Sequence, residues 1–175
     1  LRIALDGNDV QTSDDNIAKE FKKTLPMAEK IKCKIAIENH FAFPSTRMAN
    51  IIKLVGHDHL GACLDVANSI CAGEWPDETI DCLADHTINL HIKDYHFKLD
   101  PYGVGFCIEG APMGDGLTNI QSLLSKFIDK EISVLYEHWL PWPGNFEEAK
   151  KNEDKWTAEG VAYLKSMTSE LIQNQ

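Results

Sequence analysis

Short apolar runs alternate along the chain with stretches in which apolar side chains recur every three or four positions. The runs have the length of strands, whereas the stretches between them have the spacing of helices. The predicted helices begin near Asp14, Ser45, Pro76 and Asn119, and a last one contains Trp156. The second is expected to stop at Gly56, and the fourth is expected to end at Lys130. The predicted strands are 1–5, 34–38, 60–65, 87–92 and 132–137, and residues 95–116 are expected to form one long irregular segment. Strand followed by helix, repeated, is typical of a parallel sheet with crossover helices, and both an open sheet and a barrel fit.

Four side chains that can bind a metal lie at the carboxyl ends of four predicted strands. Glu38, Asp65 and Glu137 end their strands, and His91 lies one residue before the end of another. Because side chains alternate along a strand, each of the four lies on the face opposite to the strand's main apolar set. The carboxyl ends of parallel strands share one edge, which is where α/β enzymes and barrels place their sites. We therefore expect these four side chains to converge.

Three carboxylates that converge in an interior need a positive counter-charge, because an unpaired buried charge is costly. A divalent cation supplies it. Mn²⁺, Mg²⁺, Co²⁺ and Zn²⁺ all accept oxygen and imidazole ligands, and a carboxylate-rich set favours Mn²⁺ or Mg²⁺. Such an ion can hold two vicinal substrate oxygens and stabilise an enediolate. Glu38 and Glu137 would lie on opposite sides of that substrate, as base and acid.

Five short segments carry a resemblance to a known family: IAIENH at 35–40, CLDVAN at 63–68, LHIKD at 90–94, GDG at 114–116 and LYEH at 135–138. Together, and in this order, they resemble the xylose isomerase-like TIM barrel superfamily. Its sugar phosphate isomerase/epimerase branch is the most similar, and AP endonuclease family 2-like proteins also belong to it. The resemblance implies a (β/α)8 barrel with one divalent metal held by Glu38, Asp65, His91 and Glu137, the two glutamates being acid and base.

A complete barrel of this type has roughly 250 residues, whereas this chain has 175. We therefore expect residues 1–175 to be a single barrel domain that carries only the C-terminal five βα units. The N-terminal units would be missing. Those units would close the barrel and contribute to the substrate pocket.

Substrate contacts are predicted for residues that follow the ligands. His40 and Asn68 lie on the same rim, Lys93 shares the strand face of His91, and Asp94 can orient a ligand. Ketose 3-epimerases often carry a histidine three residues after the metal-binding aspartate, where this chain has Asn68. An asparagine can also hydrogen-bond a sugar hydroxyl, so the identity of the substrate stays open.

The predicted function is a metal-dependent isomerase or epimerase that moves a proton next to the carbonyl of a small sugar or sugar phosphate. A lyase similar to inosose dehydratases could use the same metal and base to eliminate water. A non-catalytic truncated barrel that acts as a binding module is the third alternative. The superfamily also contains DNA-repair endonucleases, but a net charge of −10 disfavours a nucleic-acid partner.

Composition adds three expectations about surroundings and partners. No apolar run approaches the ~20 residues that a membrane helix needs, so no membrane partner is expected. The five cysteines form no CxxC pair, which favours reduced thiols and a cytoplasmic location. Association with another copy of the chain, as a homo-oligomer, is left open.

Overall fold

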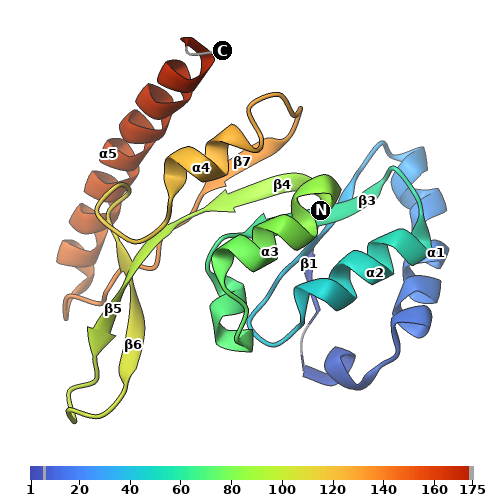
Figure 1. The fold of residues 1–175 in the computed structure, drawn as a ribbon, viewed down its shortest axis with the longest axis horizontal. Helices are drawn as coiled ribbons and strands as arrows, with labels where there is room; N and C mark the ends of the chain where they lie inside the picture. The colour runs from blue at the N-terminus through green and yellow to red at the C-terminus, as the bar shows by residue number, and fades with distance from the viewer. Residues whose placement is uncertain (6, 174–175) are drawn as a thin grey trace. The chain divides into compact units, whose positions relative to one another are not determined.

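The computed structural model, which describes residues 1–5 and 7–173, contains a parallel sheet. Within these residues the sheet has five strands in the order β1-β2-β3-β4-β7 (Figure 1). Its strands are β1 (Arg2–Ala4), β2 (Ile35–Glu38), β3 (Leu60–Asp65), β4 (Thr87–Ile92) and β7 (Ser133–Tyr136). Because β1 to β4 follow one another along the chain, lie next to one another and run parallel, the predicted class of fold, a parallel α/β sheet with crossover helices, is confirmed.

The helices follow the predicted spacing closely. They are α1 (Asp14–Lys30), α2 (Ser45–Val55), α3 (Pro76–Leu83), α4 (Ile120–Ser125) and α5 (Phe146–Gln173), with short 3-10 turns η1 (Gly7–Gln11), η2 (Asn68–Ala72) and η3 (Ala84–His86). Ser13 caps α1 through its side chain, and Gly56 ends α2 in the left-handed region, at a φ of 61°. The helix α4 ends earlier than predicted, because the chain turns at Lys126.

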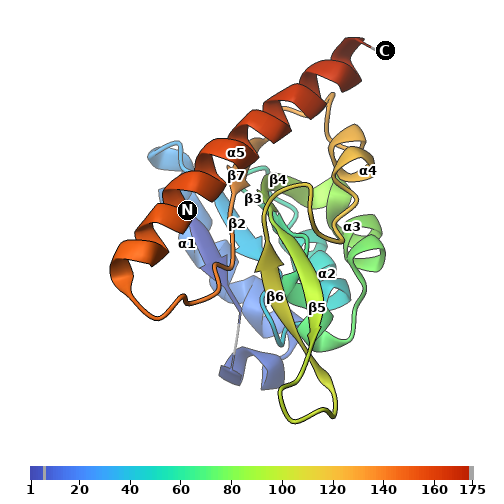
Figure 2. The ribbon, with the colours of Figure 1, turned by 90° about the vertical axis from the view of Figure 1, so that its left-hand side faces the viewer.

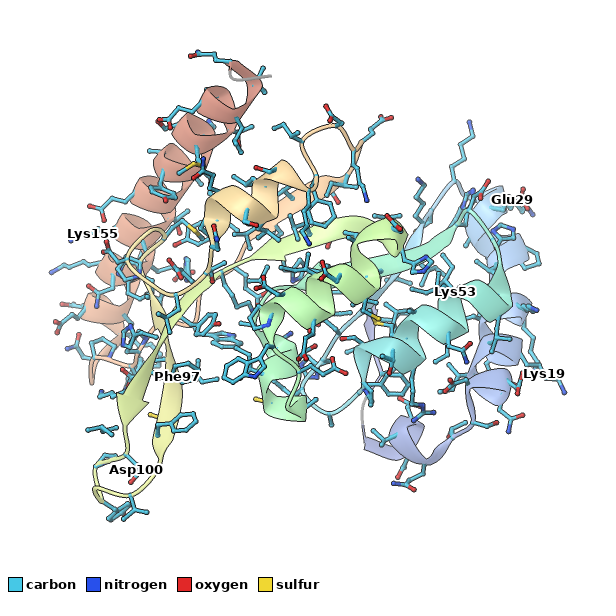
Figure 3. All side chains as sticks on the ribbon, in the orientation of Figure 1. Lys19, Glu29, Lys53, Phe97, Asp100 and Lys155 are labelled. Atoms are coloured by element: carbon cyan, nitrogen blue, oxygen red, sulfur yellow. The ribbon has the colours of Figure 1, made fainter. Side chains whose placement is uncertain are left out.

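The described chain divides into two compact units. The first contains residues 1–91 and 131–135, and the second contains residues 92–130 and 136–175. In the first unit α1 packs on α2 and α2 packs on α3, and both α2 and α3 contact β3. Met48 and Ile51 of α2 and Leu64 of β3 are fully buried in this layer. Charged side chains such as Lys19, Glu29 and Lys53 point outward from these helices (Figure 3). The apolar faces of α2 and α3 thus pack on the sheet that carries the candidate site and hold it in place.

The second unit contains a β-hairpin where the sequence indicated one long irregular segment, 95–116. Strands β5 (Asp94–Leu99) and β6 (Phe106–Ala111) pair antiparallel, and the hairpin extends away from α4 and α5 (Figure 2). Phe97 of β5 packs edge-on against Phe106 of β6, while Asp100 lies at the turn (Figure 3). The expectation of irregular structure was wrong because cross-strand pairs stabilise the hairpin, whereas its glycines concentrate at the turn and in the segment after β6.

None of the described helices is both long and apolar enough to cross a membrane. The five cysteines are all free thiols, of which Cys63 alone is fully buried.

Candidate metal centre

Three of the predicted ligands meet in the first unit, at the carboxyl ends of β2, β3 and β4. The parallel register pairs Asp65 of β3 with His91 of β4, and it pairs Glu38 of β2 with Cys63 of β3. All these side chains point to the face opposite to the helices, because they share strand parity. The sheet therefore brings together residues that lie more than twenty positions apart in the chain.

The ligand atoms of Glu38, Asp65 and His91 lie within 4.8 Å of one another. Nδ1 of His91 is 3.1 Å from Oε1 of Glu38 and 3.9 Å from Oδ2 of Asp65. The exposed fractions of the three residues are 1%, 0% and 4%, for Glu38, Asp65 and His91. Two carboxylates this deeply buried and this close repel each other, so the cluster attracts a cation.

Asp65 is held rigidly from both its backbone and its side chain. The Asn39 amide nitrogen donates to the Asp65 carbonyl oxygen at 2.8 Å, and the Asp65 N–H donates to Asn39 Oδ1 at 2.6 Å. Oδ1 of Asp65 accepts from the backbone N–H groups of Ala67 and Asn68 and so caps the turn after β3. The same carboxylate thus caps the turn with Oδ1 and presents Oδ2 to the cluster.

Two charged or polar neighbours complete the surroundings of Glu38. Arg2 of β1 forms an ion pair with Oε2 of Glu38 and supplies part of the positive charge that the cluster needs. Cys63, its register partner, donates its thiol proton to Asn89 Oδ1 at 2.9 Å. Burial raises the pKa of the Cys63 thiol, and the Glu38 and Asp65 carboxylates raise it further, whereas His91 lowers it.

The predicted substrate contacts Asn68 and His40 flank the cluster in the first unit. Asn68 is 3% exposed, and its Oδ1 has no hydrogen-bond partner among the described residues. A buried acceptor without a donor costs free energy unless a ligand supplies one. His40 is half-buried beside the ring of Phe41, with ring centroids 4.4 Å apart.

The other predicted residues lie in the second unit, where Glu137 and Lys93 form a pair. Nζ of Lys93 is 3.2 Å from Oε1 of Glu137 and 4.3 Å from the centre of the Trp139 ring. The Lys93 side chain is fully buried, so the carboxylate and the aromatic face provide its counter-charge. The Glu137 N–H donates to the carbonyl oxygen of Ile92 at 2.9 Å. Ile92 is the residue that directly follows His91 in the chain.

Asp94 organises the loop that follows β6. Its Oδ1 accepts from the N–H groups of Tyr95 and Thr118, and its Oδ2 accepts from those of Gly114 and Gly116. A Cβ on Gly116 would collide with this carboxylate, so glycine is required there. These four bonds give Asp94 a structural task, and its contact with substrate stays a prediction.

Comparisons with known proteins place the chain in a family. The sequence profile of the family described as "Xylose isomerase-like TIM barrel" matches residues 3–167. The chain belongs to this family. It is 32% identical over 155 residues to "3-oxo-isoapionate decarboxylase" of Pectobacterium atrosepticum, a match that covers 87% of this chain and 56% of the relative. The chain thus spans little more than half the length of that relative.

Solved structures share the fold. A xylose isomerase domain protein from Planctomyces limnophilus superimposes with a TM-score of 0.71 over 98% of this chain and 61% of its own, at 15% identity. A xylose isomerase-like TIM barrel protein from Mycobacterium smegmatis, solved in complex with magnesium, gives a TM-score of 0.65 over 90% of this chain and 51% of its own, at 17% identity. At these identities the likeness shows the fold alone.

Three neighbours of the ligands escaped the sequence analysis: Arg2, Asn39 and Cys63. Strand parity already placed Cys63 on the same face as Asp65, and this was the signal for it. Asn39 and Arg2 gave no such signal. Their contacts depend on which residues of adjacent strands are partners, and this register is not visible in one sequence.

Proposed function

We propose that the chain binds one divalent cation through Glu38, Asp65 and His91, with Glu137 as the fourth ligand. The observation that carries this proposal is the buried trio in the first unit, whose ligand atoms lie within 4.8 Å of one another. The addition of Glu137 is supported by its backbone bond to Ile92, the residue covalently joined to His91. The carboxylate-rich donor set favours Mn²⁺ or Mg²⁺.

We further propose that the protein is an enzyme that moves a proton next to the carbonyl of a small sugar or sugar phosphate. When bound, the cation acts as a Lewis acid and stabilises the negative charge that develops on the carbonyl oxygen. Glu38 takes the proton from the carbon, and Glu137, in its protonated form, donates its own proton to that carbon from the other side. Lys93, 3.2 Å from Glu137, keeps that side chain in place and balances the carboxylate that is left when the proton has moved to the substrate.

Asn68 and Asn39 have supporting tasks in this mechanism. The buried Oδ1 of Asn68 accepts a hydrogen bond from a substrate hydroxyl, which satisfies an acceptor that otherwise has none among the described residues. Asn39 touches no substrate. It bonds both the N–H and the carbonyl oxygen of Asp65 and so positions the carboxylate of that residue. His40 is proposed as a second substrate contact on the same rim.

A lyase reaction is the second candidate, and the relative named as a decarboxylase favours it. In that reaction a carbon–carbon bond next to the carbonyl breaks, and carbon dioxide leaves in place of a proton. The electron pair moves to the same carbonyl oxygen, and an acid then protonates the carbon. The two candidates thus share the cation and the acid, and they differ in the bond that breaks.

The decisive experiment measures metal binding first and chemistry second. Mn²⁺ binding is followed by the loss of the free-ion paramagnetic resonance signal in the wild type, Asp65→Asn and Glu137→Gln, with Glu29→Gln as a matched control on the exposed face of α1. We expect one ion per chain in the wild type and in the control. Affinity should fall at least about tenfold in the two site variants, since even neighbours of ligands contribute that much. Equal affinity in all four proteins would refute the proposed site.

The chemistry is then tested with the Mn²⁺-loaded chain on ketoses, ketose phosphates and 3-oxo sugar acids in D₂O. Exchange of a C–H proton for deuterium indicates the isomerase or epimerase class, and release of CO₂ or water indicates a lyase. Glu38→Gln should lower either rate by roughly 10² to 10⁴, the usual contribution of a general base. A chain that binds the ion and turns over none of these compounds would be a binding module.

A further inference from the structure

Cys63 places a sulfur atom inside a cluster that is otherwise made of oxygen and nitrogen donors. The register pairs it with Glu38 on one side and with Asn89 on the other, so all three side chains form one layer of the interior face. Asp65 and His91 form the next layer toward the carboxyl edge. The residue is fully buried, and its thiol is held by a hydrogen bond to Asn89.

Glu38 and His91 reach both layers and therefore belong to two overlapping donor sets. With Asp65 they form an oxygen-rich set, and with Cys63 they form a set that contains sulfur. Ligand atoms of Glu38, Cys63 and His91 lie within 4.8 Å of one another, as do those of the oxygen-rich trio. We propose that Cys63 is a metal-selectivity residue, which lets the site hold Zn²⁺ or Cd²⁺ through Glu38, Cys63 and His91. This inference rests on the proposed metal centre and adds a second mode of binding to it.

The choice between the two sets follows from the chemistry of the ion. Mg²⁺ and Mn²⁺ prefer carboxylate oxygens, whereas Zn²⁺ and Cd²⁺ bind thiolate and imidazole tightly. When such an ion binds, the Cys63 thiol loses its proton to solvent and a metal–sulfur bond replaces its bond to Asn89. The Asn89 amide nitrogen donates to Ser133 Oγ at 2.7 Å, which holds Asn89 against the sulfur.

Because Glu38 and His91 are shared, only one ion can be held at a time. A thiophilic ion therefore excludes Mn²⁺ from its preferred ligands. Cys63→Ser nearly keeps the size of the side chain but removes the soft donor, so it should weaken Cd²⁺ binding and leave Mn²⁺ binding, which uses Asp65, nearly unchanged.

The test is a titration of the purified chain with Cd²⁺, followed by the ultraviolet absorption of sulfur-to-cadmium charge transfer. The absorption is expected in the wild type at one equivalent and in Cys107→Ser, which removes an exposed thiol on β6. It should be absent in Cys63→Ser. The ratio of Cd²⁺ to Mn²⁺ affinity, from calorimetry and from the resonance signal, should fall at least about tenfold in that variant.

A measurement on the wild type alone covers the case in which Cys63→Ser does not fold. X-ray absorption of the Zn²⁺-loaded chain should show one sulfur neighbour at about 2.3 Å from the ion. If Mn²⁺ and Cd²⁺ both bind and no sulfur neighbour or charge-transfer band is found, the selectivity role of Cys63 is refuted while the metal centre stands. If neither ion binds to the wild type, the metal centre itself is refuted, and the inference is refuted with it.

Discussion

Asn39 illustrates how one residue outside the ligand set can decide the geometry of a ligand. It is fully buried, and its carboxamide bonds both the N–H and the carbonyl oxygen of Asp65 as well as the hydroxyl of Ser69. A side chain at the end of a strand has a well-defined position only if the backbone there is fixed, and beyond the strand end no sheet hydrogen bonds fix it. Asn39 supplies that restraint from the neighbouring strand end.

We predict that Asn39→Ala destabilises the chain by about 2–6 kcal/mol, because two buried backbone groups of Asp65 lose their partners at about 1–3 kcal/mol each. Urea denaturation measures the loss, with Gln121→Ala, which removes an exposed carboxamide on α4, as the control. Mn²⁺ affinity should fall about tenfold as Asp65 loses its orientation. An Asn39→Ala protein as stable as the control would show that water replaces the carboxamide.

At the residue scale the sequence predicted which candidate ligands meet better than it predicted what surrounds them. Parity alone placed Glu38, Asp65 and His91 on one face, and the structure brings these three together. The ion pair between Arg2 and Glu38, and the contact of Cys63 with Asn89, depend on strand register. Register is set by packing across the whole sheet, so one chain read in isolation does not reveal it.

The elements that the sequence predicted well are those whose burial follows a simple period. Strand β3 and helix α2 begin and end within a residue of their predicted limits, because an apolar run and an apolar stripe define them. The β5–β6 hairpin was missed for the opposite reason. Its outer part is exposed on both faces, with Tyr102 92% exposed, so its pattern lacks the burial signal that marks a core strand.

Asp14 at the start of α1 is held by the Arg47 and Asn50 side chains of α2, and these contacts make the packing of the two helices depend on pH. Nε of Arg47 is 2.7 Å from Oδ1 of Asp14, and the same guanidinium donates to the Val10 carbonyl oxygen. Partial burial raises the pKa of Asp14, but the hydrogen bonds from Asn50 and Arg47 and the charge of Arg47 outweigh it, so the pKa lies below its ordinary value of 3.8. The ionised form is therefore the one that the fold stabilises.

We predict that Asp14→Asn lowers the free energy of unfolding by about 1 kcal/mol at neutral pH, as expected for a partly exposed pair. The lowered pKa means that the stabilisation is present above the unfolded pKa and is lost as pH falls through the folded pKa. The difference between the two proteins should thus shrink as pH falls below 3.8 and vanish once pH is below the folded pKa. Thermal unfolding across pH measures it, with Asp15→Asn, the exposed neighbour in the same first turn, as the control. A difference that persists at low pH would mean that charge is not its cause.

On the scale of the whole molecule, the net charge of −10 and the buried carboxylates both favour the binding of cations. Folding without a cation brings Glu38 and Asp65 together at a cost, and Arg2 offsets only part of it. A cation that binds the folded chain and not the unfolded one must stabilise the fold by mass action. Its effect also includes a non-specific part, since any salt screens a net charge of this size.

We predict that Mn²⁺ at a hundred times its dissociation constant stabilises the chain by about 2.7 kcal/mol, and that chelation reverses the gain. Thermal unfolding is compared with Mn²⁺ and with NaCl at the same ionic strength. NaCl screens the net charge but does not occupy the site, so the difference between the two samples measures binding. Glu38→Gln should be less sensitive to Mn²⁺ and, since it removes one of two repelling carboxylates, should lose little stability in the absence of metal. If NaCl raised the unfolding temperature as much as Mn²⁺ does, the acidic surface and not the buried cluster would account for the response.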